Sequence, residues 1–449
     1  MTALIVHGHF YQPPRENPWT GKVGVEPSAA PYHDWNERIH SECYGPNAFA
    51  HIGNNSPVIN NYRNISFNFG PTLLSWLDEH QQRTYLRILA ADRESAELHE
   101  GHGNAIAQAY GHAILPLCNA RDRLTQIRWG LEDFRFRFGR RPESLWLPET
   151  ACNNETLSLL IDEGLRYVIL APEQAGRVRP NRIEPWVTLR HAEVDTTRPY
   201  RYKHMDGSGR EIAVFFYHGG LARAIAFERA LSSSSTLVAR FVEVGRHGHL
   251  VNLATDGETY GHHFKFGDLC LAYALEVDAK GSGLWVTNYG QYLDHHPPQW
   301  EVELNLGPLG EGTSWSCAHG IGRWTRDCGC LTGGEGGWNQ KWREPLRLAL
   351  DFLRDAAAVD FENDGGALFQ DPWLARNEYI KVMLDSNLMA EFIRSNQRHT
   401  FSIEEERRAR TLLEAQRNSL LMFTSCAWFF SDLAGIETVQ ILKYASRLM

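Results

Sequence analysis

In the first 260 residues, short and almost continuously apolar runs alternate with longer stretches in which apolar residues recur at helical spacing. The runs expected to form strands are Ala3–His9, Ile65–Phe69, Ala105–Gln108, Ser144–Pro148, Tyr167–Ala171, Ile212–Tyr217 and Leu250–Ala254. Runs of this kind are typical of parallel strands that are buried on both faces. The alternation therefore predicts a parallel α/β fold, either a barrel or an open sheet.

The stretches between these runs indicate helices and loops. Thr72–Leu89 and Thr125–Phe138 have the periodicity of amphipathic helices. Asn154 is a candidate N-cap for a helix over Glu155–Glu163, which Gly164 would end. Two long segments, 14–50 and 173–210, lack such periodicity and are expected to be loops. Loops of this length in a compact domain are more often functional than accidental.

After residue 307 the pattern changes. A segment rich in Gly, Trp and Cys, 307–337, is followed by helical periodicity to the end. The helices expected there are Pro345–Asp355, Trp373–Ile393, Ile403–Leu433 and Ile436–Met449, with the apolar stretch Leu420–Phe430 read as a buried helix. The last of them has no cap or breaker, which leaves open a frayed natural end or a cut inside a longer helical region.

Composition and charge narrow the class of protein. The net charge is −9 and no run of Lys or Arg stands out, so a nucleic-acid partner is not expected. No signal peptide and no membrane span are predicted, because the apolar stretches are too short. Eight scattered cysteines fit reduced thiols in a cytoplasmic protein better than a disulfide framework. The segment 101–104 lacks the residues of a phosphate loop, and no cofactor is expected.

Ionisable side chains gather where the expected strands end. His7 and His9 end the first strand, and His112 follows the third. Glu149 follows the fourth strand and Asp256 the seventh. In a parallel barrel, the carboxyl ends of the strands form the face that carries the chemistry. We therefore expect these side chains to meet at one rim.

Glu149 and Asp256 are the candidate catalytic pair. Two carboxyl groups that face one substrate are what glycosidic cleavage needs, one to attack or stabilise the sugar cation and one to move the proton. The apolar neighbours of Glu149 should raise its pKa. A simpler interpretation of either residue alone is a helix cap or an ion pair with Arg, and only the conjunction with the histidines favours catalysis.

The histidines and cysteines leave room for a metal. His7 and His9 point to the same face of a strand and suit either hydrogen bonds to a sugar or metal ligation. His262 and His263 could complete such a metal site with Asp256. Cys328 and Cys330, with Cys317 upstream, hint at zinc; the spacing is not Cys-x-x-Cys and no fourth ligand is obvious, so no metal is predicted.

Four segments together resemble glycoside hydrolase family 57. They are His7-Gly-His9-Phe-Tyr-Gln12-Pro13, His112-Ala-Ile-Leu-Pro-Leu117, Trp146-Leu-Pro-Glu149 and Asp256-Gly-Glu258-Thr-Tyr-Gly-His262. They occur in the order of that family's motifs and cover about the first 265 residues. The variable fifth motif of the family is placed at Trp315–His319, and the helices beyond it look like a subgroup with a poorly characterised C-terminal region.

The resemblance implies an incomplete (β/α)7 barrel over residues 1–300, followed by a mainly helical region over 301–449. It also implies a retaining enzyme for α-glucan or malto-oligosaccharide, of amylase, glucanotransferase or branching type, with Glu149 as nucleophile and Asp256 as general acid/base. The residues implied to bind substrate are His7, His9, Gln12, His112, Trp146, Glu258, His262, Trp315 and His319.

Two other functions stay open at this point. One is a metal-dependent hydrolase of the polysaccharide deacetylase kind, with His7, His9 and Asp256 as ligands, which would leave Gln12 and Glu149 without a role. The other is a non-catalytic glucan-binding protein whose helical end binds a partner. The intact carboxylates count against it. The sequence gives no indication of the oligomeric state.

Overall fold

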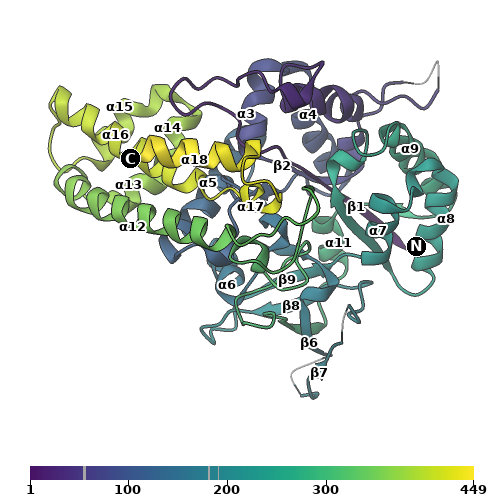
Figure 1. Cartoon of the computed structure of the whole chain (residues 1–449). Coiled ribbons are helices and arrows are strands. Elements are labelled where there is room, and N and C mark those ends of the chain that lie inside the picture. The colour runs from purple at the N-terminus through teal and green to yellow at the C-terminus, as the bar shows by residue number, and fades with distance from the viewer. Residues whose placement is uncertain (54–56, 181–182, 191) are drawn as a thin grey trace.

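The computed structural model describes residues 1–449 except 54–56, 181–182 and 191 (Figure 1). Seven parallel strands are arranged in the order of the sequence. They are β1 (Ala3–Phe10), β2 (Ser66–Phe69), β3 (Ala107–Gln108), β4 (Leu145–Trp146), β5 (Tyr167–Leu170), β9 (Glu211–Phe216) and β10 (Leu250–Asp256). All seven strands predicted from the apolar runs are present, with ends that differ by one or two residues.

The strands close into a barrel with one open seam. Strand β1 pairs in parallel with β2 and with β10, β3 with β4, and β5 with β9. Isolated parallel bridges, Phe67 to Ala105 and Ser144 to Tyr167, connect β2 to β3 and β4 to β5. Between β9 and β10 the described residues form no ladder; His218 N donates to Asn252 O at 2.7 Å there. The predicted incomplete (β/α)7 barrel is confirmed.

Helices pack on the outside of these strands (Figure 1). Their bounds are α3 (Pro71–His80), α4 (Gln82–Leu98), α5 (Ala120–Phe138), α6 (Asn154–Asp162), α7 (Gly219–Phe227), α8 (Ser234–Gly245), α9 (Gly267–Tyr273), α10 (Ala279–Gly281) and α11 (Tyr289–His295). The single helix predicted over 72–89 is wrong, because Gln81 leaves the helical region at φ −137° and separates α3 from α4. The cap of α6 is Asn153, whose side chain accepts from Thr156 N, and not Asn154.

The two long segments predicted as loops are loops in part: most of 14–34 and much of 173–210 are irregular, but both segments also contain regular elements. Residues 14–50 contain the short helices α1 (Trp35–Ile39) and α2 (Gly45–Ala48). The segment 173–210 contributes three short strands to a β-sheet extension next to β9 and is otherwise turns and loop, apart from 181, 182 and 191, which lie outside the described residues. It contains β6 (Ala175–Arg179), β7 (Val187–Thr188) and β8 (Tyr200–Lys203), and β12 (Trp300–Leu304) joins it; the short β11 (Trp285–Val286) pairs with β1 instead. Short antiparallel strands with exposed faces lack the continuous apolar signal that revealed the barrel strands.

The C-terminal region is helical, with more breaks than predicted. Its helices are α12 (Arg343–Leu368), α13 (Pro372–Glu378), α14 (Ile380–Leu384), α15 (Met389–Asn396), α16 (Ile403–Leu421), α17 (Cys426–Phe429) and α18 (Ile436–Leu448). The continuous helix predicted over 420–430 is wrong. Thr424 Oγ1 donates to Gly111 O at 2.9 Å, and Ser425 N donates to His112 O at 2.9 Å. These bonds to the barrel hold a turn where the helix would otherwise continue.

The helical region packs against the β3–α5 side of the barrel and shares a core with it (Figure 1). Trp129 of α5 is fully buried in this core and its Nε1 donates to Arg376 O at 3.0 Å. Arg376 and Asp122 form a buried ion pair at 2.7 Å across the same contact. Within the described residues, no helix is long and apolar enough to cross a membrane.

Candidate functional site

The strand register brings the predicted residues of β1 and β10 into one line with side chains of β2. His9 lies opposite Asp256 of β10 on one side and opposite Asn68 of β2 on the other. His7 lies two residues earlier on the same face of β1, opposite Ser66. Directly after Asp256, Gly257 leaves room for the ring of Phe10, whose Cδ1 would lie 2.3 Å from an added Cβ. A larger residue would displace the turn that follows Asp256.

The two histidines of β1 are buried and neutral. His7 Nδ1 contacts Ser66 Oγ at 2.9 Å, and its Nε2 contacts Asn68 Oδ1 at 3.1 Å. His9 Nδ1 lies 2.9 Å from Asn68 Nδ2. Burial is the main cause that lowers the pKa of each imidazole to about 3. Both therefore serve as uncharged hydrogen-bonding groups near neutral pH.

These polar contacts argue against the metal-dependent alternative. Both ring nitrogens of His7 already face Ser66 and Asn68. Among the described residues, His7, His9 and Asp256 are not part of any His, Cys, Asp or Glu group compact enough to hold an ion. The deacetylase-like interpretation is therefore not supported by the positions of its own proposed ligands.

An aromatic layer covers the histidines. Trp146 of β4 stacks on His7 at 4.8 Å and on His9 at 5.0 Å between ring centroids. The edge of Trp315 meets Trp146 at 5.2 Å. Tyr11 stacks on His112 at 3.7 Å. Flat rings with polar edges are the surfaces on which sugar rings pack.

Glu149 occupies a strained turn directly after β4. Its φ is +59°, and Thr150 follows at +50°, in the left-handed region that residues with a Cβ rarely adopt. His112, at +53°, shares this conformation. Such strain costs about 1–3 kcal/mol per residue and is kept where the surroundings enforce it, commonly at functional sites.

The Glu149 carboxylate accepts two hydrogen bonds on one oxygen. Trp315 Nε1 donates to Oε2 at 3.0 Å and Ser316 Oγ donates to the same atom at 2.7 Å. The side chain is 8% exposed, and this burial raises the pKa of Glu149. The bonds from Ser316 and Trp315, and then the charge of Arg323, act in the opposite direction by stabilising the ionised form.

Asp256 is the second carboxyl of the site. It is exposed to water on one side, yet the protein atoms around it are close enough to desolvate its carboxyl. This desolvation, and then the negative charge of Glu149, raise the pKa of Asp256 to about 7. Of the two neighbouring carboxyls, Asp256 is therefore the one prepared to hold a proton near neutral pH.

The structure distributes the other predicted residues differently. Glu258 is buried behind the site, where Tyr44 Oη donates to it at 2.5 Å and Tyr11 N at 3.2 Å, and its burial raises its pKa to about 8. His262 pairs with Glu42. Gln12 accepts from Arg15 at 2.7 Å. His319 does not join these residues, because its Nδ1 lies 3.5 Å from Cys330 Sγ.

Several residues of the site were missed from the sequence. Ser316, the closest donor to Glu149, lies 167 residues away along the chain. Ser425 Oγ contacts His112 Nδ1 at 2.7 Å from the helical region. Asn68 bridges His7 and His9 and its amide donates to Gln108 Oε1 at 2.7 Å. Only Asn68, an isolated amide inside an apolar strand, carried a signal in the sequence.

Comparisons with known proteins agree with this geometry. The model of Glycosyl hydrolase family 57 matches residues 4–302, and that of a domain of unknown function, DUF3536, matches residues 338–449. No curated protein matches the chain significantly.

Solved structures with the same fold are distant in sequence. An exo-type maltose-forming amylase from Pyrococcus sp. ST04 superimposes with a TM-score of 0.73 at 15% identity, covering 99% of this chain and 79% of that one. A GH57-type branching enzyme from Pyrococcus horikoshii gives 0.60 at 16%, covering 100% and 88%. A 4-alpha-glucanotransferase from Thermococcus litoralis gives 0.56 at 16%, covering 100% of this chain and 57% of that one.

The family match spans well over half of the chain, and the barrel and its strand-end carboxyls are where the four motifs predicted them. The chain belongs to glycosyl hydrolase family 57, whose members act on α-glucans as hydrolases or transferases.

Proposed function

We propose that this chain cleaves or transfers the α-glucosidic bonds of an α-glucan or malto-oligosaccharide through a covalent glycosyl-enzyme, with Glu149 as nucleophile and Asp256 as general acid/base. One observation carries the assignment. Glu149 is held by two donors on one oxygen, whereas the pKa of Asp256 is raised to about 7. An ionised nucleophile beside a protonated acid is the starting state of a retaining glycosidase.

The reaction then has two steps. In the first, a Glu149 oxygen attacks the anomeric carbon while Asp256 gives its proton to the departing glycosidic oxygen. In the second, Asp256 takes a proton from water or from a sugar hydroxyl, whose oxygen attacks the same carbon and releases Glu149. Two displacements retain the anomeric configuration, and they require carboxyl groups about 5–5.5 Å apart.

The surroundings of the carboxyls fit a sugar substrate. The stacked rings of Trp146 and the histidines, almost fully buried, form the wall of the site, and the neutral imidazoles add no charge beside the developing sugar cation. Tyr11 Oη, Gln108 Nε2 and Trp146 Nε1 are buried without a hydrogen-bond partner among the described residues. Buried polar atoms of this kind are usually satisfied by water or ligand, and we assign them to sugar hydroxyls or to the waters that precede them.

We assign the catalytic groups to residues 1–300 and a supporting role to 301–449. Trp315 and Ser316 hold Glu149 and Ser425 holds His112, so the second part positions side chains of the first. We extend substrate binding to Trp315, because its ring edge meets Trp146 and Tyr217 beside Glu149. We withdraw His319 from the substrate-binding set, because its contact is with Cys330.

The test is product analysis with linear malto-oligosaccharides. Wild-type protein should give shorter sugars alone if it hydrolyses, or both shorter and longer sugars if it transfers, and the first-formed product should have the α-configuration by NMR. Glu149→Gln should lower the rate by on the order of 10⁴-fold or more, because the covalent step is lost.

The matched control is Glu155→Gln, an exposed carboxyl six residues away at the start of α6. It should retain wild-type rates. Products of the β-configuration, or a Glu149→Gln variant as active as this control, would contradict the proposal.

A further inference from the structure

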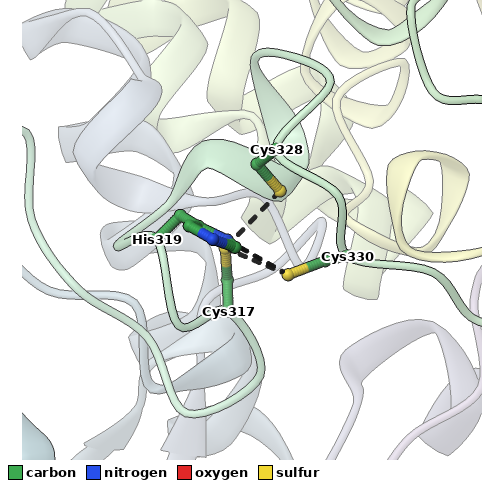
Figure 2. Close-up of side chains that lie close together, drawn as sticks. All are labelled: Cys317, His319, Cys328 and Cys330. Carbon is green, nitrogen blue, oxygen red and sulfur yellow. Dashed lines mark hydrogen bonds between the residues drawn. The ribbon is translucent and has the colours of Figure 1, made fainter.

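A cluster of metal-binding side chains lies in the segment between the barrel and the C-terminal helices. We call it the Cys/His cluster, and its members are Cys317, His319, Cys328 and Cys330. Their four ligand atoms all lie within 4.8 Å of one another. Figure 2 shows the four side chains pointing toward one another from two adjacent loops. No step of the proposed reaction uses them.

The distances within the cluster are those of a tetrahedral site. Cys317 Sγ lies 3.9 Å from Cys328 Sγ and 3.8 Å from Cys330 Sγ, and His319 Nδ1 lies 3.5 Å from Cys330 Sγ. With Zn–S bonds of about 2.3 Å and Zn–N bonds of about 2.0–2.1 Å, an ideal tetrahedron has S···S edges of about 3.8 Å and S···N edges of about 3.5–3.6 Å. The three observed separations match these edges, and the remaining three are no longer than 4.8 Å.

The same distances do not fit a disulfide. A disulfide requires sulfur atoms about 2.05 Å apart, and the three thiols are free. Three cysteines also cannot all be paired with one another. Gly329, at φ +86°, reverses the chain between Cys328 and Cys330. The two cysteines, separated by this one residue, can therefore both point to the middle of the cluster.

The charges around the cluster favour a bound ion with thiolate ligands. Arg343 is fully buried, and its Nη1 donates to Cys330 O at 2.9 Å. Its Nε and Nη2 have no partner among the described residues. One zinc ion with three thiolates and a neutral imidazole carries a net charge of −1, which would balance this buried guanidinium.

We propose that the Cys/His cluster binds one structural zinc ion. All four coordination positions are filled by protein, which is typical of structural and not catalytic zinc. On binding, the three S–H bonds are broken and their protons pass to solvent, so the affinity falls as the pH falls. The three cysteines hinted at zinc in the sequence, but the fourth ligand was not recognised, because His319 was assigned to substrate binding.

The ion would fix the segment that holds the nucleophile. Ser314 and Cys317 pair as an antiparallel bridge, which puts Trp315 and Ser316 at the tip of the turn and the first ligand directly behind it. At the other end of the cluster, Thr332 N donates to Ser431 Oγ at 2.9 Å in the helical region. Zinc is therefore placed to join the donors of Glu149 to the C-terminal helices.

The test is the metal content of the full chain, purified under reducing conditions and measured by elemental analysis. We expect one equivalent of zinc per chain, lost in Cys328→Ser, Cys330→Ser and His319→Ala. The matched control is Cys270→Ser, a half-buried thiol of α9 outside the cluster, which should keep its zinc. Replacement of zinc by Co²⁺ should give thiolate charge-transfer bands and the visible bands of a tetrahedral ion.

A second measurement keeps the proposal testable if a variant fails to fold. Wild-type protein treated with a chelator should lose thermal stability and regain it when Zn²⁺ alone is added. Absence of stoichiometric metal with no effect of Zn²⁺ would overturn the proposal, as would a disulfide found between Cys317 and either partner. Stoichiometric iron on the same residues would overturn the choice of zinc. None of these readouts depends on glycosidase activity.

Discussion

The barrel and the chain beyond it contribute to the same site in different ways. The barrel, which the family model covers over residues 4–302, supplies both carboxyls from the ends of β4 and β10. The segment 303–337 lies outside both family matches, and it supplies both side-chain donors to Glu149. In the proposed mechanism the two regions therefore have different roles: the barrel holds the two proposed catalytic carboxyls, and the second region holds Glu149 in position.

The two regions also position their side chains by different physical means. In the barrel, backbone ladders fix the register, so His9 necessarily lies between Asp256 and Asn68. In the segment after the barrel, Trp315 and Ser316 lie on a loop whose backbone is bonded to Glu149. There Trp315 N donates to Glu149 O at 3.1 Å. A loop of this kind can change between relatives without disturbing the barrel. We therefore expect substitutions of the barrel carboxyls to lower activity strongly, and substitutions in the second region to lower activity or stability by smaller amounts.

The largest effect is expected from Asp256→Asn, which removes the acid of the barrel. We expect kcat/KM to fall by about 10²–10⁴-fold, as for loss of a general acid/base. In the wild type, kcat/KM should decline as the pH rises through about 7, because the protonated form of Asp256 is required and its pKa is raised to about 7. The variant should lose this alkaline limb, measured as a pH–rate profile. A limb that persists unchanged would assign the proton to another group.

The next effect concerns stability across the contact between the regions. Arg376→Met removes the closer of the two cations beside the buried Asp122, because the other, Arg354, has its Nε 3.9 Å from it. It also removes the contacts of Arg376 with Thr125 and Gln416. Removing one side of a buried ion pair costs about 3–5 kcal/mol of unfolding free energy. Urea denaturation should detect this loss. The control is Arg394→Met, at an exposed position on α15. A loss below about 1 kcal/mol, within the range of ordinary surface changes, would show that the regions are only loosely coupled.

Ser316→Ala probes the loop of the second region directly. Loss of a hydrogen bond to a charged group costs about 1.5–3 kcal/mol, which corresponds to about 10- to 100-fold in kcat/KM. Because this bond stabilises the ionised form, its loss should also raise the pKa of Glu149 and move the acid limb of the profile to higher pH. Ser316→Thr, which keeps the hydroxyl, should restore both. An unchanged acid limb in the alanine variant would remove Ser316 from this role.

The smallest effect is expected from Ser425→Ala in the helical region. It removes the contact of Ser425 Oγ with His112 Nδ1, a neutral bond worth about 1 kcal/mol, or about fivefold in kcat/KM. Steady-state kinetics and thermal unfolding should be measured together. If only stability falls, the helical region is a scaffold. A loss of kcat/KM as large as that of Asp256→Asn would contradict this distinction between the two regions.

The sequence predicted the barrel well because its signals are local. A buried parallel strand appears as a continuous apolar run, and the polar residue that ends it, such as Glu149 or Asp256, stands next to that run. The helix break at 422–425 could not be predicted from the neighbouring residues, because it depends on contacts with Gly111 and His112, more than 300 residues earlier in the chain. The break at Gln81 has no breaker residue that would mark it in the sequence. The positions of Ser316 and of the Cys/His cluster also depend on turns of the chain, and turns leave no apolar periodicity in the sequence.

The pairing of His112 with Ser425 also has a consequence for the order of events during synthesis. Domains generally fold as they emerge from the ribosome, which adds about 5–20 residues per second, so Ser425 follows Asp256, the later of the two carboxyls, by roughly 8–34 s. During that interval the barrel strands are all present, but the turn at 422–425 and the helices that cover His112 are not. The nascent chain therefore carries both carboxyls before the turn that holds His112 has formed, and the contacts around His112 are completed only when the helices that cover it dock.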